Sequence, residues 1–158
     1  MLTHSESVIS DFFSKNVDTI NSKLFIVRGA PGSGKTTLAK KIAHYLNAEH
    51  FENDSFFTDE QGNYKFDFNF HQQAKDECFQ KTKKALLAGE TVVVSNTFIK
   101  ISEIEPYIDI CIKNGDINYF VIEMMLEFDN THNVPQSVVE QKKADFEPLK
   151  DSIIIERA

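Results

Sequence analysis

The stretch Gly29-Ala30-Pro31-Gly32-Ser33-Gly34-Lys35-Thr36 decides the fold of this chain. The apolar run at residues 24–27 precedes it, and apolar residues at helical spacing follow it within residues 38–46. A buried strand, a tight glycine turn and an amphipathic helix, in that order, are the surroundings that the motif G-x-x-x-x-G-K-[ST] requires. We therefore predict that this stretch is a phosphate-binding loop between a strand and a helix.

The glycines of this stretch free its backbone to turn, so that successive amide N–H groups point at phosphate oxygens. The helix that begins at Lys35 adds the positive end of its dipole. We expect the Lys35 ammonium to bind the β and γ phosphates, and the Thr36 hydroxyl to complete the octahedral shell of a Mg²⁺ ion. The predicted nucleotide-binding residues are Gly29, Ala30, Pro31, Gly32, Ser33, Gly34, Lys35, Thr36 and Thr37. The alternative is a glycine-rich turn without a ligand.

The composition fits one globular domain over residues 1–158, with 41% hydrophobic and 26% charged residues. No apolar run approaches the ~18 residues that a membrane span needs. The N-terminus lacks the basic start and apolar run of a signal peptide. Cys78 and Cys111 lie far apart and form no disulfide framework or metal-ligand spacing. We therefore expect a cytoplasmic protein that has no membrane partner.

The net charge of −7 disfavours non-specific attachment to a nucleic-acid backbone, although it leaves room for a local basic cleft. Arg28 and Arg157 are the only arginines of the chain. Guanidinium groups are the preferred side chains for bidentate phosphate binding. Such a role therefore falls to these two residues, to lysines or to another molecule.

Apolar patterns divide the chain into alternating strands and helices. Strands are predicted at residues 23–28, 50–53, 91–95, 117–124 and 152–155. Helices are predicted within residues 1–22 and at 35–47, 71–88, 102–114 and 135–147. Five strands that alternate with helices give a three-layer α/β domain with a mainly parallel sheet.

An aromatic segment at residues 56–70 surrounds the turn Gln61-Gly62-Asn63. Alternation at Tyr64, Phe66, Phe68 and Phe70 predicts an extended segment with one buried face. These rings either pack in the core or stack on a nucleobase.

Polar residues follow two of the predicted strands, at the sheet edge where ligands bind in open α/β folds. Asp54 and Ser55 follow the second strand, and Asn96 and Thr97 follow the third. Many phosphate-loop enzymes carry a metal-organising aspartate after the third strand, and no acid stands there in this chain. Asp54 is either a general base that faces the γ-phosphate or a residue that initiates a turn.

Further motifs extend the match beyond the phosphate loop, over residues 28–147. In chain order they are Arg28-Gly29 with Pro31-Gly32-Ser33-Gly34-Lys35-Thr36, Asp54-Ser55-Phe56-Phe57, Gly62-Asn63-Tyr64-Lys65-Phe66, Ala74 with Cys78, Asn96-Thr97 with Glu105-Pro106-Tyr107, and Asn130-Thr131-His132-Asn133-Val134-Pro135. With these motifs the chain resembles the polynucleotide-kinase-type phosphate-loop kinases. That group includes the 5′-kinase domain of phage polynucleotide kinase and many chains described as AAA-type ATPases.

The resemblance implies roles for particular residues. Asp54 corresponds to the general base for the 5′-hydroxyl acceptor, and Lys35 binds the transferring phosphate of ATP. Asn96 and Thr97 are placed beside the nucleotide and the acceptor. Residues 125–147 correspond to a lid and final helix, in which Asn130 and His132 match the lid pattern.

The lid of these kinases normally presents an arginine before the asparagine, whereas this chain has Asp129. Three outcomes are open: Lys142 or Lys143 replaces the arginine, a protein partner donates a cation, or turnover is slow. Three functions stay open as well. The first is transfer of the ATP γ-phosphoryl group to the 5′-hydroxyl of RNA or DNA, the second is transfer to a small molecule, and the third is nucleotide binding without transfer.

Overall fold

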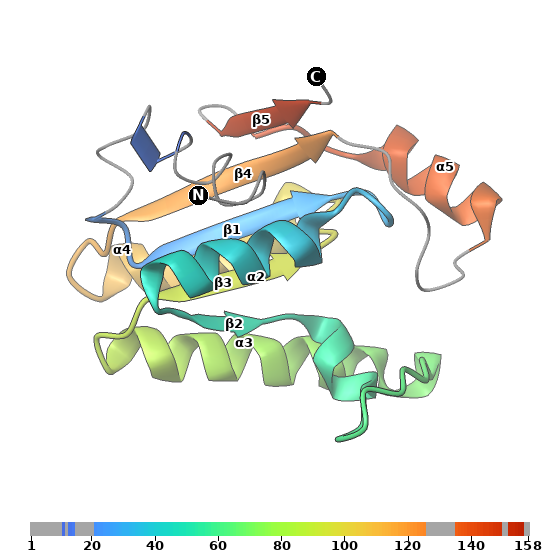
Figure 1. Ribbon diagram of the computed structural model, residues 1–158, viewed down its shortest axis with the longest axis horizontal. Helices are drawn as coiled ribbons and strands as arrows, with labels where there is room; N and C mark the ends of the chain where they lie inside the picture. Colours follow the sequence, from blue (N-terminus) through green and yellow to red (C-terminus); the bar gives the residue numbers. More distant parts are fainter. Residues whose placement is uncertain (1–10, 12, 15–20, 126–134, 150–151, 157–158) are drawn as a thin grey trace, which may run out of the picture.

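The computed structural model of the chain describes residues 11, 13–14, 21–125, 135–149 and 152–156. These residues form a five-stranded sheet in the order β2-β3-β1-β4-β5, and every pair of neighbouring strands is parallel (Figure 1). The strands are β1 (Leu24–Gly29), β2 (Glu49–Phe51), β3 (Val92–Asn96), β4 (Tyr119–Met125) and β5 (Ile153–Glu156). The predicted parallel α/β fold is confirmed.

The helices form the outer two layers around the sheet. They are α2 (Lys35–Leu46), α3 (His71–Leu87), α4 (Ile101–Lys113) and α5 (Gln136–Asp145), with short 3-10 helices η2 (Asn53–Phe57) and η3 (Phe68–Phe70). Helix α2 covers one face of the sheet, and α3 and α4 cover the other face (Figure 1). Most of these helices begin and end within one or two residues of their predicted bounds.

Strand β1 is buried on both faces, which explains why its sequence is continuously apolar. Leu24 and Ile26 pack into the cluster under α3 and α4, whereas Phe25 and Val27 pack under α2. This alternation follows from the two-residue period of a strand. The parallel register then aligns the strand ends, so that Arg28 pairs with Asn96 of β3 and with Glu123 of β4.

The second strand is shorter than predicted, because it ends at Phe51 instead of residue 53. The backbone N–H of Asn53 donates to the side-chain Oδ1 of Asn96 over 2.7 Å. A side chain therefore replaces the next hydrogen bond of the ladder, and the chain turns into η2. Asp54 consequently lies in a 3-10 turn just beyond the edge of the sheet.

The prediction of an extended segment with one buried face over residues 64–70 is wrong. Tyr64 forms a single antiparallel bridge with Thr58, residues 68–70 form η3, and Phe66, Phe68 and Phe70 are exposed. The turn is held locally, because the Asp59 carboxylate accepts hydrogen bonds from the backbone of Gln61 and Asn63. Alternating aromatic residues therefore do not mark a buried strand face here.

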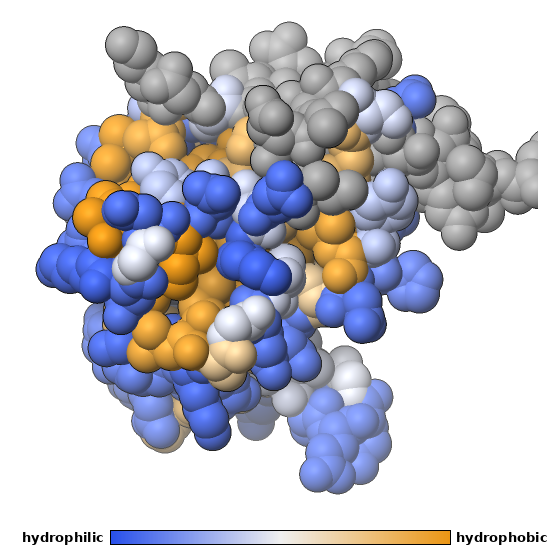
Figure 2. All heavy atoms as spheres, turned by 90° about the vertical axis from the view of Figure 1, so that its left-hand side faces the viewer, coloured by the Kyte–Doolittle hydropathy of each residue, from blue (hydrophilic) through white to orange (hydrophobic). Residues whose placement is uncertain are grey.

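The molecule has two different ends. The phosphate loop lies at the end to which the strands point, together with α5 (Figure 1). Figure 2 shows the opposite end, where hydrophobic atoms reach the surface between hydrophilic ones. Leu87 and Ile112, in the last turns of α3 and α4, are exposed. In the described part of the chain, none of the helices is long and apolar enough to cross a bilayer.

Most of the predicted N-terminal helix lies outside the described residues. Asp11, Phe13 and Ser14 are helical, and the Phe13 ring packs edge-on against Phe25 with a centroid separation of 6.0 Å. The lid residues 126–134 also lie outside them, including Asn130 and His132.

Candidate functional site

The predicted phosphate loop has the backbone geometry of an anion cradle. Gly32 and Gly34 adopt positive φ angles of 78° and 86°, a region that other residues disfavour. A Cβ atom on Gly29 would lie 2.7 Å from the carbonyl oxygen of Met124. Helix α2 starts directly after Gly34, so its first amide groups point into the loop. Ser33 Oγ is buried in the loop without a hydrogen-bond partner among the described residues, which fits a ligand oxygen.

The Lys35 side chain lies inside this cradle, and its Nζ donates to the carbonyl oxygen of Ala30 over 3.4 Å. Burial lowers the pKa of Lys35 to about 8, although the carboxylates of Asp54 and Glu52 act to raise it. The charge of Lys142 lowers the same pKa further. The charges of two carboxylates and of a second ammonium therefore act on Lys35.

Glu52 is a site residue that the sequence analysis missed. Its Oε2 accepts hydrogen bonds from Thr36 Oγ1 over 2.9 Å and from Ser95 Oγ over 3.2 Å. Ser95 in turn lies 2.7 Å from Nε2 of His50. An acid from the segment after β2 thus contacts the phosphate-loop threonine. The end of β3, where many phosphate-loop enzymes carry such an acid, has Asn96 and Thr97 instead. The missed signal was an acid two residues before Asp54, combined with a third strand that ends in Ser95 and Asn96.

Asp54 lies on the same 3-10 turn, and its charge acts on Lys35 across the site. Tyr64 donates a hydrogen bond from its hydroxyl to Asp54 Oδ1 over 3.4 Å. Burial, and then the neighbouring carboxylate, raise the pKa of Tyr64 to about 12, so the phenol keeps its proton. The structure therefore brings Lys35, Thr36 and Asp54 together.

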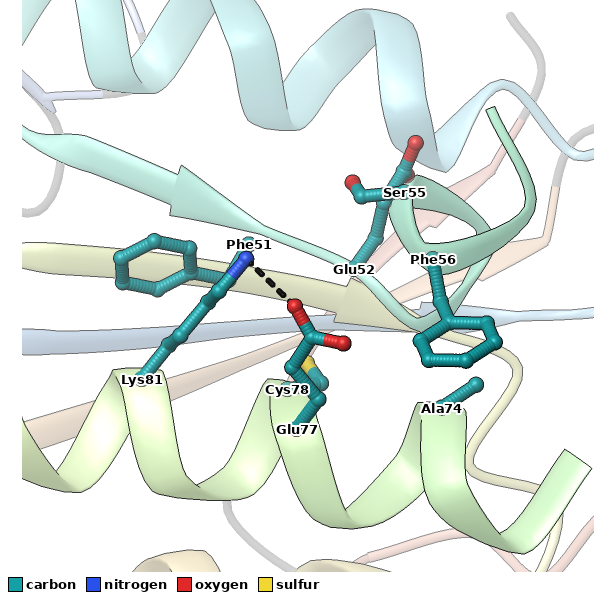
Figure 3. A pocket seen from close by; sticks show the side chains of 8 residues that line it. All are labelled: Phe51, Glu52, Ser55, Phe56, Ala74, Glu77, Cys78 and Lys81. Carbon is teal, nitrogen blue, oxygen red and sulfur yellow. Dashed lines mark ion pairs between the residues drawn. The ribbon is translucent and has the colours of Figure 1, made fainter. Parts of the chain in front are cut away.

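The close-up in Figure 3 shows that side chains at the end of β2 and in the segment after it point to two different helices. Glu52 and Ser55 point toward α2, while Phe51 and Phe56 point toward α3. A small pocket separates this segment from α3, and an ion pair of 2.8 Å between Lys81 and Glu77 lies beside it. The polar side chains of the segment consequently gather on the side of the phosphate loop.

Asn96 lies beneath this segment. Its Oδ1 accepts the hydrogen bond from the Asn53 backbone, and its Nδ2 contacts Cys78 Sγ at 3.7 Å. Thr97 uses its carbonyl oxygen to accept the backbone N–H of Gly29 over 3.2 Å. Asn96 therefore fixes the position of η2, and Thr97 ties the phosphate loop to the end of β3.

Arg28 has a structural role. Its guanidinium is fully buried, pairs with Glu123 over 2.9 Å and donates from Nε to the carbonyl oxygen of Phe98 over 3.0 Å. The ring of Phe146 lies 4.0 Å from the guanidinium carbon. Arg28 is thus unavailable for a phosphate, and Arg157 lies outside the described residues. The role considered for the arginines is therefore left to Arg157, to lysines or to another molecule.

Helix α5 brings one lysine to the site. The segment after α5 is held at the sheet edge, because Glu147 N donates to Ile99 O over 2.8 Å and Leu149 N donates to Glu123 Oε1 over 2.6 Å. Lys142 lies in the last turn of α5, four residues before Phe146, whose ring contacts the Arg28 guanidinium. Its charge lowers the pKa of both Lys35 and His71. Lys142 is therefore near the phosphate loop.

The sequence profile of a family described as an AAA domain matches residues 24–122, which is more than half of the chain. The chain belongs to this family. The match runs from β1 into β4 and includes the phosphate loop, Glu52, Asp54 and Asn96. Membership therefore covers every site residue described above except Lys142 of α5.

The known proteins with related sequences or folds include several kinases. A cytidylate kinase of Pyrobaculum islandicum is 33% identical over 93 residues, which are 54% of this chain and 50% of that protein. The chain thus spans about half the length of the curated relative it matches. A gluconokinase from Sinorhizobium meliloti 1021 superposes with a TM-score of 0.60 at 14% identity, covering 85% of this chain and 82% of that one.

A chain of the Pnkp1/Rnl/Hen1 RNA repair complex superposes with a TM-score of 0.59 at 16% identity. It covers 78% of this chain and 43% of that chain. These similarities establish a phosphate-loop kinase-like fold for the AAA domain family member described here.

Proposed function

We propose that this chain is a phosphotransferase that moves the γ-phosphoryl group of ATP to a hydroxyl acceptor. The observation that carries the proposal is the setting of Lys35, a desolvated ammonium at a glycine-rich loop on which the charges of Asp54 and Glu52 act. A cation that binds the transferring phosphate and a carboxylate that faces the same point are the groups that phosphoryl transfer to a hydroxyl requires.

The acceptor oxygen forms a bond to the γ-phosphorus, the bond to the bridging oxygen of ADP breaks, and the hydroxyl proton passes to Asp54. The Tyr64 hydroxyl holds the Asp54 carboxylate by donating to Oδ1. Asp54 is therefore proposed as the general base.

The Thr36 hydroxyl and the Glu52 carboxylate provide a hard-oxygen donor set that suits Mg²⁺. In the proposed complex Thr36 and Glu52 would hold the ion, Thr36 through its hydroxyl and Glu52 through hydrogen bonds to water molecules of the ion. The ion would supply positive charge to the β and γ phosphates. Glu52 thereby takes the role that an acid at the end of β3 has in many phosphate-loop enzymes.

Lys142 is proposed as the cation that replaces the missing lid arginine. The positive charge of Lys142 lowers the pKa of both Lys35 and His71. Mutual repulsion of this kind is relieved when a polyanion binds between the groups. The arrangement therefore supports a phosphate position between Lys35 and Lys142.

The preferred acceptor is the 5′-hydroxyl of RNA or DNA. Support comes from the ordered motifs shared with polynucleotide kinases, and the chain of the RNA repair complex has the same fold. A small-molecule acceptor is the second candidate. The net charge of −7 favours it, and the similar gluconokinase acts on a small molecule by its name.

The proposal is tested with γ-labelled ATP and an oligonucleotide that carries a 5′-hydroxyl. We expect label on the oligonucleotide, and we expect Asp54→Asn to lower the rate by about 10²- to 10⁴-fold with ATP binding retained. Asp109→Asn, at an exposed position of α4, is the matched control and should transfer at the parental rate.

Equal transfer by Asp54→Asn and the parent would contradict the role of Asp54. If the oligonucleotide stays unlabelled, small hydroxyl compounds are screened for a mass gain of one phosphate. ATP binding without transfer to any acceptor would contradict the kinase proposal and favour a nucleotide-binding module.

A further inference from the structure

The aromatic residues between η2 and α3 are exposed, although aromatic side chains usually contribute to the core. Phe68 has an exposed fraction of 77%, Phe66 of 47% and Phe70 of 46%. Phe57, by contrast, is buried at 9%. Folding alone does not account for three exposed phenyl rings in one short segment.

The exposed rings are ordered relative to one another. Phe68 and His71 stack with a centroid separation of 5.9 Å and an interplanar angle of 6°. Phe66 lies edge-on to His71 at 6.1 Å and contacts Phe57 of η2 at 4.9 Å. We call Phe66, Phe68 and His71 the aromatic shelf. Flat rings with open faces are the surface on which nucleobases stack.

The aromatic shelf is joined to the position of the proposed general base. Phe57 lies three residues after Asp54 in η2, and it contacts Phe66 of the shelf. The Asp54 charge also acts on the His71 imidazole. A group that stacks on the shelf therefore lies next to the acceptor hydroxyl.

The charges around the shelf suit a polynucleotide end. Lys75 follows His71 by one turn of α3, and Lys142 lies on α5. Burial is the largest cause of the lowered pKa of His71, and the charges of these two lysines lower it further. The carboxylates of Glu103 and Asp54 also act on His71 and raise its pKa. The Asp67 carboxylate accepts the backbone N–H of Asn69. Lys75 and Lys142 are the positive groups that can bind the phosphate on the 3′ side of a stacked 5′-terminal base.

We propose that the aromatic shelf binds the nucleobase at the 5′ end of a single-stranded polynucleotide acceptor, with the 5′-hydroxyl at Asp54. This inference rests on the proposed function and specifies its acceptor. Stacking does not read base identity, so all four bases should be accepted. The 5′ end must be unpaired, because a base inside a duplex keeps its faces covered by its neighbours.

The test compares Phe68→Ala with Phe68→Trp on a 5′-hydroxyl oligonucleotide and on the same oligonucleotide with an abasic 5′ nucleotide. Phe68→Ala should raise the KM for the normal acceptor by about 5- to 150-fold, the range of one lost base–aromatic stack, and leave the KM for ATP unchanged. Phe68→Trp should restore the KM. The abasic acceptor should have a high KM that Phe68→Ala does not raise further.

Tyr119→Ala is the matched control, because Tyr119 is a 39% exposed aromatic residue at the start of β4, away from the loop. It should leave every KM unchanged. An unaltered KM in Phe68→Ala, or an equal rise for the normal and the abasic acceptor, would overturn the inference.

A binding measurement separates the shelf from the kinase proposal. An oligonucleotide with 2-aminopurine at its 5′ end should lose fluorescence when it stacks on the parent protein and should keep it with Phe68→Ala. Quenching by the parent without phosphate transfer would support the shelf and contradict the kinase. Transfer without quenching, or quenching that persists in Phe68→Ala, would contradict the shelf.

Discussion

The lowered pKa of Lys35 predicts that ATP affinity falls as the pH rises above about 8. Burial is the largest cause of the shift from the usual value of 10.5. A bound triphosphate places several negative charges beside the ammonium, which raises its pKa again in the complex. The free protein therefore releases a proton in this pH range that the complex holds, and binding has to take this proton up.

The magnitude follows from proton linkage. Where the free Lys35 is neutral and the bound Lys35 is charged, each pH unit above about 8 lowers the association constant about 10-fold. Below that value the affinity should be independent of pH as far as Lys35 is concerned. Calorimetry with a non-hydrolysable ATP analogue, in buffers of different ionisation enthalpy, measures both the affinity and the number of protons taken up.

Two variants make the prediction specific. Lys35→Arg keeps its charge at high pH, so its affinity should stay flat over the same range. Lys142→Met removes the cation that lowers the Lys35 pKa, so the fall should begin at a higher pH than in the parent. Parental affinity that is as flat as that of Lys35→Arg would refute the reasoning, because Lys35 would then be charged in the free protein.

Three further predictions concern neighbouring groups. Glu52→Gln should raise the Mg²⁺ concentration needed for nucleotide binding by about 10- to 100-fold with little effect on metal-free binding, as a Mg²⁺ titration of affinity can show. Glu123→Ala leaves the buried Arg28 charge unpaired, so it should lower the free energy of unfolding by about 3–5 kcal/mol, as measured by urea unfolding. The double variant Glu123→Ala with Arg28→Met removes both charges, so its free energy of unfolding should fall by less. Lys142→Met should lower kcat by about 10³-fold with a nearly unchanged KM for ATP, and Lys142→Arg should restore kcat in steady-state kinetics.

The sheet and the phosphate loop could be predicted because their signals are local and continuous. Residues 24–27 are apolar without interruption, as a strand covered on both faces requires, and the glycine spacing fixes the turn that follows. Parallel pairing then brings the strand ends to one edge, which places the phosphate loop and Asp54 at the same edge of the sheet. These inferences need no knowledge of side-chain orientation.

Glu52 and the aromatic segment could not be predicted in the same way. The role of Glu52 arises from hydrogen bonds to Thr36 and Ser95, which are 16 and 43 residues away in the sequence. No local sequence pattern predicts these two hydrogen bonds. Residues 64–70 alternate like a strand, but Tyr64 pairs with Thr58 in a single bridge and residues 68–70 form η3. Phe68 therefore lies in a 3-10 helix, where its ring is exposed.

The position of Asn96 connects the absent strand-end acid with the residue that replaces it. An acid at Asn96 would accept the Asn53 N–H equally well, but it would place a carboxylate against Cys78 Sγ in the buried space below η2. The asparagine amide makes both contacts without a buried charge. Asn96 thereby holds the segment in which Glu52 and Asp54 flank Asn53. The charged carboxylate on the side of Thr36 is then that of Glu52. Because β2 is a three-residue edge strand that pairs only with β3, this side-chain hydrogen bond anchors the backbone between the two proposed acids, and Thr36, Ser95 and Tyr64 then orient their carboxylates.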